Sequence, residues 1–439
     1  MISERAWADI DLAALRQNLA VLRELAAPDR DVMLVVKADA YGHGMQLVAT
    51  IAQRCGIRSF GVRDSSEALE LRSVGISGQI LVLGTAIESE LQHCLEMGIE
   101  LAIHSTDRVK SLRQLVRRMN GRLRSKPRVH LNVDTGMGRL GLPADRAPQV
   151  LDAILHAPEL QLVGIMTHLA RPEGGFHPFT LEQSERFQRV LKVAESRSLK
   201  LGSDGVRVHI GNSAALFTGM SLKGDLVRPG IAAYGFMPKR ILGGMIPGSE
   251  RLAPVMSLRG QIAFMKDVPK GTSISYAQEW TAPNKTRIAT VPIGYYDGIP
   301  WRLKGKGFAL VRGQRAPIVG RVTMDYVMLD IGSIPGAKVG DVVTLFGRDG
   351  DAEIPVSEIA EAVDTIPYEI TCMVGTRVKR VPIDRDVERD HQILPRIAVG
   401  DSPLVLGSES ESGLLSSADE REGDGNALAQ ATGAASASQ

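Results

Sequence analysis

Eight short apolar runs, separated by segments with helical spacing, occupy the first half of this 439-residue chain and restrict its fold more than any other feature. The runs cover residues 32–38, 59–62, 79–84, 100–104, 129–134, 162–168, 206–212 and 226–231. Between them, 10–25, 46–53, 65–74 and 181–195 have the apolar spacing of amphipathic helices. About eight strand–helix units in roughly 230 residues is typical of a closed, parallel (β/α)8 barrel of the TIM type. The alternative, a doubly wound open sheet, needs fewer strands and a crevice motif near the start, which we do not find.

The pattern changes near Pro254, where strand-like stretches begin to follow one another directly. These stretches are 255–264, 286–293, 308–311, 317–319, 327–331 and 342–346, with Gly-Gln, Asp-Gly and Gly-Asp pairs between them. They predict an all-β second domain that ends near Pro382. From Gly400 onward few large apolar residues remain, which indicates a disordered tail. The predicted α/β architecture is therefore a barrel (1–245), a β-rich domain (246–383) and a tail (384–439).

Charge and composition exclude several classes of protein. The formal net charge is +2 and no run of Lys and Arg exceeds two residues, so we expect no nucleic-acid partner. The sequence has no export segment and no stretch of about 18 apolar residues, which predicts a cytoplasmic protein without a membrane partner. Cys55, Cys94 and Cys372 are widely separated, as expected for reduced thiols. The nine histidines show no metal-ligand spacing, so no metal is predicted.

Lys37 is a candidate nucleophile because it follows the apolar run 32–36. At the end of a buried barrel strand its amine would face the C-terminal mouth, where barrel active sites lie. Apolar surroundings lower the pKa of a lysine, and a neutral amine can form a Schiff base. Taken alone, a lysine that reaches water or pairs with Asp39 is the simpler interpretation.

The residues that follow Lys37 favour its interpretation as a nucleophile over that of a solvated or ion-paired lysine. The stretch 35–44 contains Lys37-Ala38-Asp39-Ala40-Tyr41-Gly42-His43-Gly44. It closely resembles the pyridoxal-phosphate attachment signature of alanine racemases, and further motifs of that family follow in order from about Arg5 to Pro382. The resemblance implies that Lys37 holds pyridoxal 5'-phosphate and that Tyr41 lies near its phosphate.

A second motif is Asp134-Thr135-Gly136-Met137-Gly138-Arg139-Leu140-Gly141. Its G-x-G-x-x-G spacing also occurs in dinucleotide sites, but those need a helix that opens on the glycines and an acidic residue about twenty positions on. Pro143 and the run 161–166 do not supply these, so we expect a tight loop at the barrel mouth instead. By resemblance, Arg139 contacts the phenolic oxygen of the cofactor and the substrate carboxylate.

The resemblance assigns further cofactor contacts in later motifs. His168 would lie beside the tyrosine base, and Arg228 would face the pyridine nitrogen of the cofactor and disfavour its protonation. Residues 212–215, Asn-Ser-Ala-Ala, are a favourable helix start, and hydroxyl and backbone N–H groups there and after a late strand can bind phosphate. The phosphate-side contacts are expected from Asn212, Ser213, Gly230, Ile231 and Tyr368.

The β-rich domain carries the remaining family segments. Tyr276, in Ile274-Ser275-Tyr276-Ala277, resembles the second catalytic base, and Tyr295 and Met324 match residues of the substrate entrance. In this family these groups reach the site of the partner subunit, so the resemblance implies a homodimer. It also implies interconversion of L- and D-alanine by two bases, Lys37 and Tyr276, which would supply D-alanine for peptidoglycan.

Asn132 departs from the family pattern, because many members have a lysine there that can be carbamylated. Asparagine cannot be carbamylated, and some broad-specificity amino-acid racemases resemble this chain in having asparagine at this position. A broad-specificity racemase is therefore the main alternative, although the known ones are exported. A non-catalytic pyridoxal-phosphate carrier would match the barrel half only, and decarboxylases lack the segments at 134–141 and 320–325.

Overall fold

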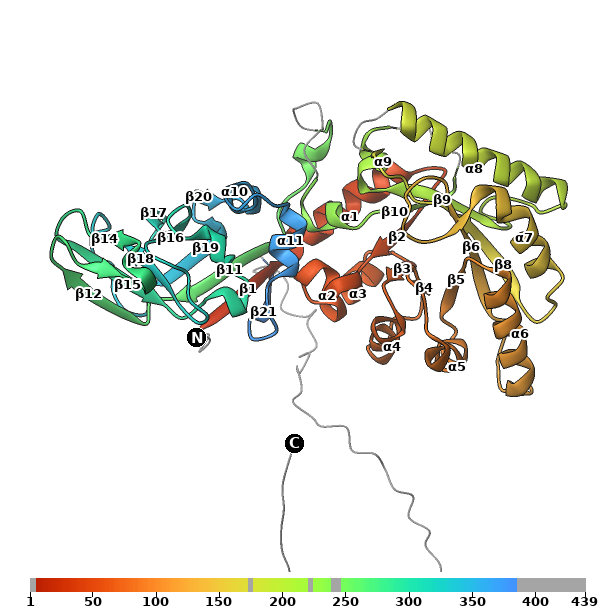
Figure 1. The fold of residues 1–439 in the computed structure, drawn as a ribbon, viewed down its shortest axis with the longest axis horizontal. Coiled ribbons are helices and arrows are strands. Elements are labelled where there is room, and N and C mark those ends of the chain that lie inside the picture. The colour runs from red at the N-terminus through yellow and green to blue at the C-terminus, as the bar shows by residue number, and fades with distance from the viewer. Residues whose placement is uncertain (1–4, 173–176, 220–223, 238–245, 385–439) are drawn as a thin grey trace, which may run out of the picture. The chain divides into compact units, whose positions relative to one another are not determined.

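A computed structural model describes residues 5–172, 177–219, 224–237 and 246–384 (Figure 1). The predicted tail lies outside these residues except for Asp384. Two β-structures organise the described chain, a parallel barrel and a set of mostly antiparallel sheets. Among its helices, none has the length and apolar character of a membrane span.

The barrel confirms the predicted (β/α)8 fold. Its eight parallel strands run in the order β5-β4-β3-β2-β10-β9-β8-β6, and pairing of β5 with β6 closes the ring. The strands are β2 (Asp31–Val35), β3 (Ser59–Val62), β4 (Gln79–Val82), β5 (Glu100–Ile103), β6 (Arg128–Asp134), β8 (Gln161–Met166), β9 (Arg207–Asn212) and β10 (Leu226–Arg228). The short strand β7 (Leu142–Pro143) extends β6 at its C-terminal end.

Helices cover the outside of the barrel (Figure 1). They are α1 (Leu12–Ala26), α3 (Met45–Arg54), α4 (Ser65–Ser73), α5 (Glu88–Glu96), α6 (Thr106–Met119), α7 (Ala147–Leu155), α8 (Pro178–Ser196) and α9 (Ser213–Phe217). Inside the ring, Met33, Leu81, Ala102, Met166 and Leu226 form an apolar cluster. The interior is therefore packed with side chains, and the cavity of the barrel is confined to its mouth.

The first helix begins two residues later than predicted, because residues 10 and 11 end a strand. The Asp11 carboxylate accepts a hydrogen bond of 3.0 Å from the Ala14 N–H and caps the first turn. Leu15, Leu19 and Leu22 are fully buried on one face of α1. That face packs into the core, as the apolar spacing predicts.

The second sheet contains the first strand of the chain. Its order is β17 (Gln314–Pro317), β16 (Phe308–Val311), β19 (Val342–Asp349), β11 (Met256–Gln261), β1 (Ala6–Asp11) and β21 (Lys379–Ile383), with β20 (Ala352–Ile354) beside β19. A three-stranded sheet joins β12 (Phe264–Val268), β15 (Thr286–Val291) and β18 (Val327–Asp330), and β13 (Ser273–Ile274) pairs with β14 (Trp280–Thr281). The region also holds two short helices, α10 (Val356–Ala362) and α11 (Pro367–Cys372), so it is β-rich and not all-β.

Candidate active site

A cavity of about 730 Å³ opens at the C-terminal ends of the barrel strands. Every residue predicted to hold the cofactor lines it. These residues are Lys37, Tyr41, Arg139, His168, Asn212, Ser213, Arg228, Gly230, Ile231 and Tyr368, and Asn132 lines it as well. These residues lie on or directly after five different barrel strands and on α11, so the closed barrel is what brings them together.

The lining of this cavity is strongly cationic. It includes Lys37, Arg63, Arg139 and Arg228, and its described residues include no aspartate or glutamate. Arg63 was not predicted, although its place directly after β3 is a position where barrel enzymes carry functional groups. A concave site with this charge suits an anionic ligand such as a phosphate ester or a carboxylate.

The amine of Lys37 has the environment expected of a nucleophile. Burial, followed by the positive charge of Arg139, holds the pKa of Lys37 below its ordinary value. Asp39, the alternative ion-pair partner, has other contacts. Its Oδ1 accepts a hydrogen bond of 2.7 Å from the Met45 N–H, and its Oδ2 lies 3.8 Å from Arg380.

Lys37 begins a short segment, α2 (Lys37–Gly42), that the sequence does not predict. The four residues Ala38, Asp39, Ala40 and Tyr41 have φ between 52° and 54°, so the backbone makes a left-handed turn. Each non-glycine residue in this region costs roughly 1–2 kcal/mol. Contacts from elsewhere in the chain hold the turn, including a hydrogen bond of 2.9 Å from Arg380 Nε to the Gly42 carbonyl.

Two tyrosines share the wall beside this turn. The rings of Tyr41 and Tyr368 lie 6.5 Å apart, centre to centre. Burial raises the pKa of Tyr41 to about 12, so its phenol remains protonated and can donate a hydrogen bond. A Cβ at Gly230 would lie 2.6 Å from the Tyr41 Oη, so glycine there makes room for the hydroxyl.

The predicted phosphate-side residues adopt a helix start. The Asn212 side chain accepts a hydrogen bond of 3.1 Å from the Ala215 N–H and caps α9. The Ser213 Oγ accepts from the N–H groups of Gly230, at 3.0 Å, and Ala232, at 3.3 Å. The Gly230 N–H, predicted to face a phosphate, is thus engaged by Ser213. The hydroxyl proton of Ser213 can still be donated into the cavity.

Arg139 lies on the tight loop predicted from its glycines. Asp134 accepts hydrogen bonds of 2.8 Å from the N–H groups of Gly136 and Met137, which folds the loop back on the end of β6. Gly136 and Gly138 have φ of 139° and 69°. The chain then enters β7 and not a helix, so the dinucleotide interpretation fails here.

Arg228 is 5% exposed and is held by carbonyl and imidazole groups. Its Nη1 donates to the His209 carbonyl at 2.7 Å, and its Nη2 donates to the Thr167 carbonyl at 2.6 Å. Burial, and next the charge of Arg139, lower the pKa of Arg228 to about 10, so it stays protonated at neutral pH. We did not predict a role for His209, although a histidine in the middle of a buried strand was the available signal.

His168 is neutral in this environment. Burial and the nearby charge of Arg228 lower the pKa of His168 to about 3. Arg228 Nη2 lies 3.5 Å from His168 Nδ1. Because arginine only donates, Nδ1 is the acceptor, and the proton of the neutral ring lies on Nε2.

Three other predicted residues of the β-rich region, Tyr276, Tyr295 and Met324, do not line this cavity. Tyr276 is 70% exposed, Met324 51% and Tyr295 42%. Their segments lie together, since the Tyr295 N–H donates to the Thr323 carbonyl at 2.9 Å and the Ser275 hydroxyl donates to the Arg321 carbonyl at 2.8 Å. This exposure excludes the interpretation of Tyr276 as a core aromatic.

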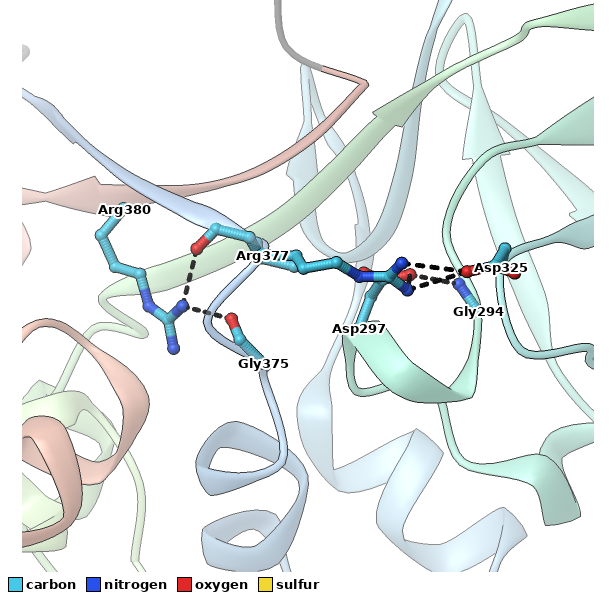
Figure 2. A network of polar contacts seen from close by, with 7 residues as sticks. Gly294, Asp297, Asp325, Gly375, Arg377 and Arg380 are labelled. Atoms are coloured by element: carbon cyan, nitrogen blue, oxygen red, sulfur yellow. Dashed lines mark hydrogen bonds and ion pairs between the residues drawn. The ribbon is translucent and has the colours of Figure 1, made fainter. Parts of the chain in front are cut away.

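Arg377 braces the segments of Tyr295 and Met324 against each other. Figure 2 shows its guanidinium between two carboxylates, Asp297 and Asp325. Nε and Asp297 Oδ1 are 3.0 Å apart, as are Nη1 and Asp325 Oδ1. Asp297 also accepts a hydrogen bond of 2.9 Å from the Gly294 N–H. This arginine was not predicted.

Comparison with protein families matches nearly all of the described chain. Residues 10–238 match the alanine racemase N-terminal domain, and residues 255–382 match the alanine racemase C-terminal domain. The chain is 40% identical over 389 residues to the alanine racemase of Citrifermentans bemidjiense, covering 87% of this chain and 99% of the relative. The Methanococcus maripaludis alanine racemase is 37% identical over 384 residues, with shares of 87% and 99%.

Solved structures agree with this assignment. The Bacillus anthracis alanine racemase with bound L-Ala-P has a TM-score of 0.78 at 35% identity, covering 87% of this chain and 96% of that one. The Bartonella henselae alanine racemase with covalently bound pyridoxal phosphate has a TM-score of 0.75 at 30% identity, with shares of 86% and 99%. On these matches and this fold, the chain belongs to the alanine racemase family of isomerases.

Proposed function

We propose that this protein is a pyridoxal-phosphate-dependent alanine racemase that works as a homodimer and supplies D-alanine for peptidoglycan. The observation that carries the proposal is the half-buried Lys37 amine, with its lowered pKa, in a cationic cavity at the barrel mouth. The family membership and the relative with covalently bound pyridoxal phosphate support it.

The donors of the cavity fit pyridoxal 5'-phosphate. The Lys37 amine suits the aldehyde, and the hydroxyls of Ser213 and Tyr41 suit the phosphate oxygens. The protonated Arg228 suits the pyridine nitrogen as a hydrogen-bond donor. When bound, this cofactor withdraws electrons from the α-carbon of an attached amino acid and makes its C–H bond acidic.

The chain itself must then move a proton between two faces of the α-carbon. A rigidly held base reaches one face, so two bases on opposite faces meet the geometric requirement. Lys37, with its lowered pKa, serves the D-alanine face. Tyr276 from the partner serves the L-alanine face. Each positioned base contributes typically about 10²–10⁴ in rate.

His168 supports the phenolate form of that tyrosine by a hydrogen bond and not by charge. Its imidazole is neutral, with the Nε2 proton available because Nδ1 faces Arg228. The positive charge near the phenolate comes from Arg139 and Arg228 on the same cavity wall. Arg139 also provides a forked donor for the substrate carboxylate.

Dimerisation completes the site in this proposal. Tyr276, Tyr295 and Met324 are exposed apolar groups on one folded chain, and each is assigned to the substrate end of a site. Seated at the mouth of a neighbouring barrel, they would exclude water and supply the second base. Exposed aromatic groups of this kind are typical of interface anchors.

Purified protein incubated with pyridoxal phosphate and L-alanine, L-serine, L-lysine or L-arginine tests the proposal. We expect D-alanine to form fastest, and no product without the cofactor. Lysine or arginine turnover equal to that of alanine would favour a broad-specificity racemase, the alternative that Asn132 in the cavity wall favours. Absence of any racemisation, with the cofactor bound, would refute both.

A further inference from the structure

A hydrogen-bonded chain of buried ionisable groups crosses the barrel interior and ends at Arg228. The His130 Nε2 and the Glu100 Oε2 are 2.7 Å apart, the His130 Nδ1 and the His209 Nε2 are 3.0 Å apart, and the His209 Nδ1 and the Arg228 Nη1 are 3.1 Å apart. The exposed fraction of these residues is 2% for Glu100 and His130, 0% for His209 and 5% for Arg228. Of the four, only Arg228 lines the cavity.

The chemistry of the two ends fixes the direction of every hydrogen bond between them. Arginine has only donors, so the His209 Nδ1 accepts and the ring proton of a neutral His209 lies on Nε2. That proton is donated to the His130 Nδ1, which leaves the His130 proton on Nε2, facing Glu100. An ionised carboxylate only accepts, so Glu100 imposes the same direction from the other end.

The electrostatics agree with this arrangement. Burial, and next the charge of Arg228, hold the pKa of His209 well below its ordinary value, so the ring is neutral. Burial alone would raise the pKa of Glu100. The hydrogen bond from His130 and the charge and hydrogen bond of Arg128, whose Nε lies 2.7 Å from the Glu100 Oε1, outweigh it, and the net pKa is lowered. Glu100 is therefore ionised and Arg228 protonated, with two neutral imidazoles between them.

The barrel leaves space for this chain at one glycine. Gly164 on β8 lies directly opposite His130 on β6 in the register of the two strands. A Cβ at Gly164 would lie only 2.1 Å from the His130 Nδ1, the atom that faces His209. Any side chain there would displace the imidazole, so glycine at this position permits the chain to exist.

We propose that Glu100 and His130 are positioning residues that act on Arg228 through His209. They fix the orientation of the guanidinium by its Nη1 contact. Nη1 and Nη2 are used by the contacts described, and Nε is the remaining donor. The inference rests on the proposed function, in which Arg228 meets the ring nitrogen of the cofactor.

Replacement of Glu100 by glutamine would test whether a carboxylate, which only accepts hydrogen bonds, is needed to keep the direction of the chain. A glutamine amide can donate as well as accept, so it permits the reverse direction of the chain. In that direction the His209 Nδ1 carries a proton and faces an Arg228 N–H, which repels the guanidinium. Glu100→Gln thus preserves the shape of the chain, removes its negative charge and leaves Arg228 as the one end that imposes a direction. Gly164→Ala preserves all charges and displaces His130.

Both variants are compared as holoenzymes with a matched control, Asp9→Asn. Asp9 is a carboxylate of similar burial, 7% exposed, paired with Arg259 in the β-rich sheet. The readouts are the visible absorption spectrum of bound pyridoxal phosphate, kcat and KM for alanine, and the melting temperature. We expect both barrel variants to change the spectrum and to lower kcat on the order of 10-fold, with KM nearly unchanged. Loss of the hydrogen-bond partner of a metal-ligating histidine has an effect of this size in metalloenzymes. Asp9→Asn should lower only the melting temperature.

The apoprotein gives an independent readout. In protein labelled with ¹⁵N-histidine, His130 and His209 should both be neutral with the proton on Nε2, and Glu100→Gln should produce a second tautomer. An unchanged spectrum and kcat in both variants, with an active wild type, would overturn the role of Glu100 and His130 alone. A wild-type chain that binds no pyridoxal phosphate would overturn the proposed function and this inference together.

Discussion

Gly42→Ala should destabilise the protein by far more than its backbone conformation explains. Gly42 has φ of +84°, and a Cβ there would lie 2.0 Å from the Thr371 carbonyl oxygen. Alanine with this φ costs roughly 1–2 kcal/mol relative to glycine. The overlap with backbone must also move α11 away from α2, and overpacking of this kind typically costs about 1–3 kcal/mol. We expect a total loss of about 3 kcal/mol.

Gly75→Ala is the matched control, because Gly75 has φ of +83° and no atom within 4 Å of its Cβ position. It should lose about 1 kcal/mol. Urea unfolding followed by circular dichroism gives both free energies at comparable m values. Because α2 carries Lys37 and Tyr41 and α11 carries Tyr368, only Gly42→Ala should also weaken pyridoxal-phosphate binding. A difference below about 0.5 kcal/mol between the two variants would refute this packing argument.

Three further outcomes follow from the site. Tyr276→Phe should slow solvent deuterium exchange at the α-carbon of L-alanine by about 10²–10⁴ and that of D-alanine less, with Tyr326→Phe as control; equal slowing would contradict the two-base assignment. Arg377→Gln removes the brace between two carboxylates and should raise KM for alanine several-fold while the cofactor stays bound; an unchanged KM would exclude that role. Burial lowers the pKa of His43 to about 4, so the unfolded state takes up a proton first and the free energy of unfolding should fall as the pH drops from about 6.5 towards 4, less steeply in His43→Gln.

The barrel could be predicted because its signal is local and repeated. Each of the eight apolar runs became one strand, and no boundary moved by more than three residues, the shift seen for β2, which ends at Val35. The tight loop at 134–141 could also be predicted, because its glycines permit positive φ and the nearby Asp134 carboxylate accepts hydrogen bonds from its backbone. The resemblance supplied the roles of residues such as Tyr276, which periodicity alone would have placed in a core.

Features that depend on contacts between residues far apart in the sequence could not be predicted from local patterns. Nothing in Ala38, Ala40 or Tyr41 favours a left-handed turn, and contacts from α11 and Arg380 impose it. Glu100 and His130 look like ordinary strand residues until the closed barrel brings their side chains together. Arg377 likewise gains its meaning only when Asp297 and Asp325, far away in sequence, lie on either side of it (Figure 2).

The position of β1 has a consequence for how the chain is made. Ala6–Asp11 lies between β11 and β21, so Trp7 pairs with Arg259 on one side and with Lys379 on the other. During synthesis on the ribosome the last barrel strand, which ends at Arg228, emerges before β11, which begins at Met256, and long before β21, which begins at Lys379. The nascent protein then carries an unpaired strand with unsatisfied amide groups, which is prone to pair with other chains. Release of a barrel fragment that ends before β11 should therefore yield aggregates, whereas the same fragment begun at Leu12 should remain dispersed, as light scattering would report.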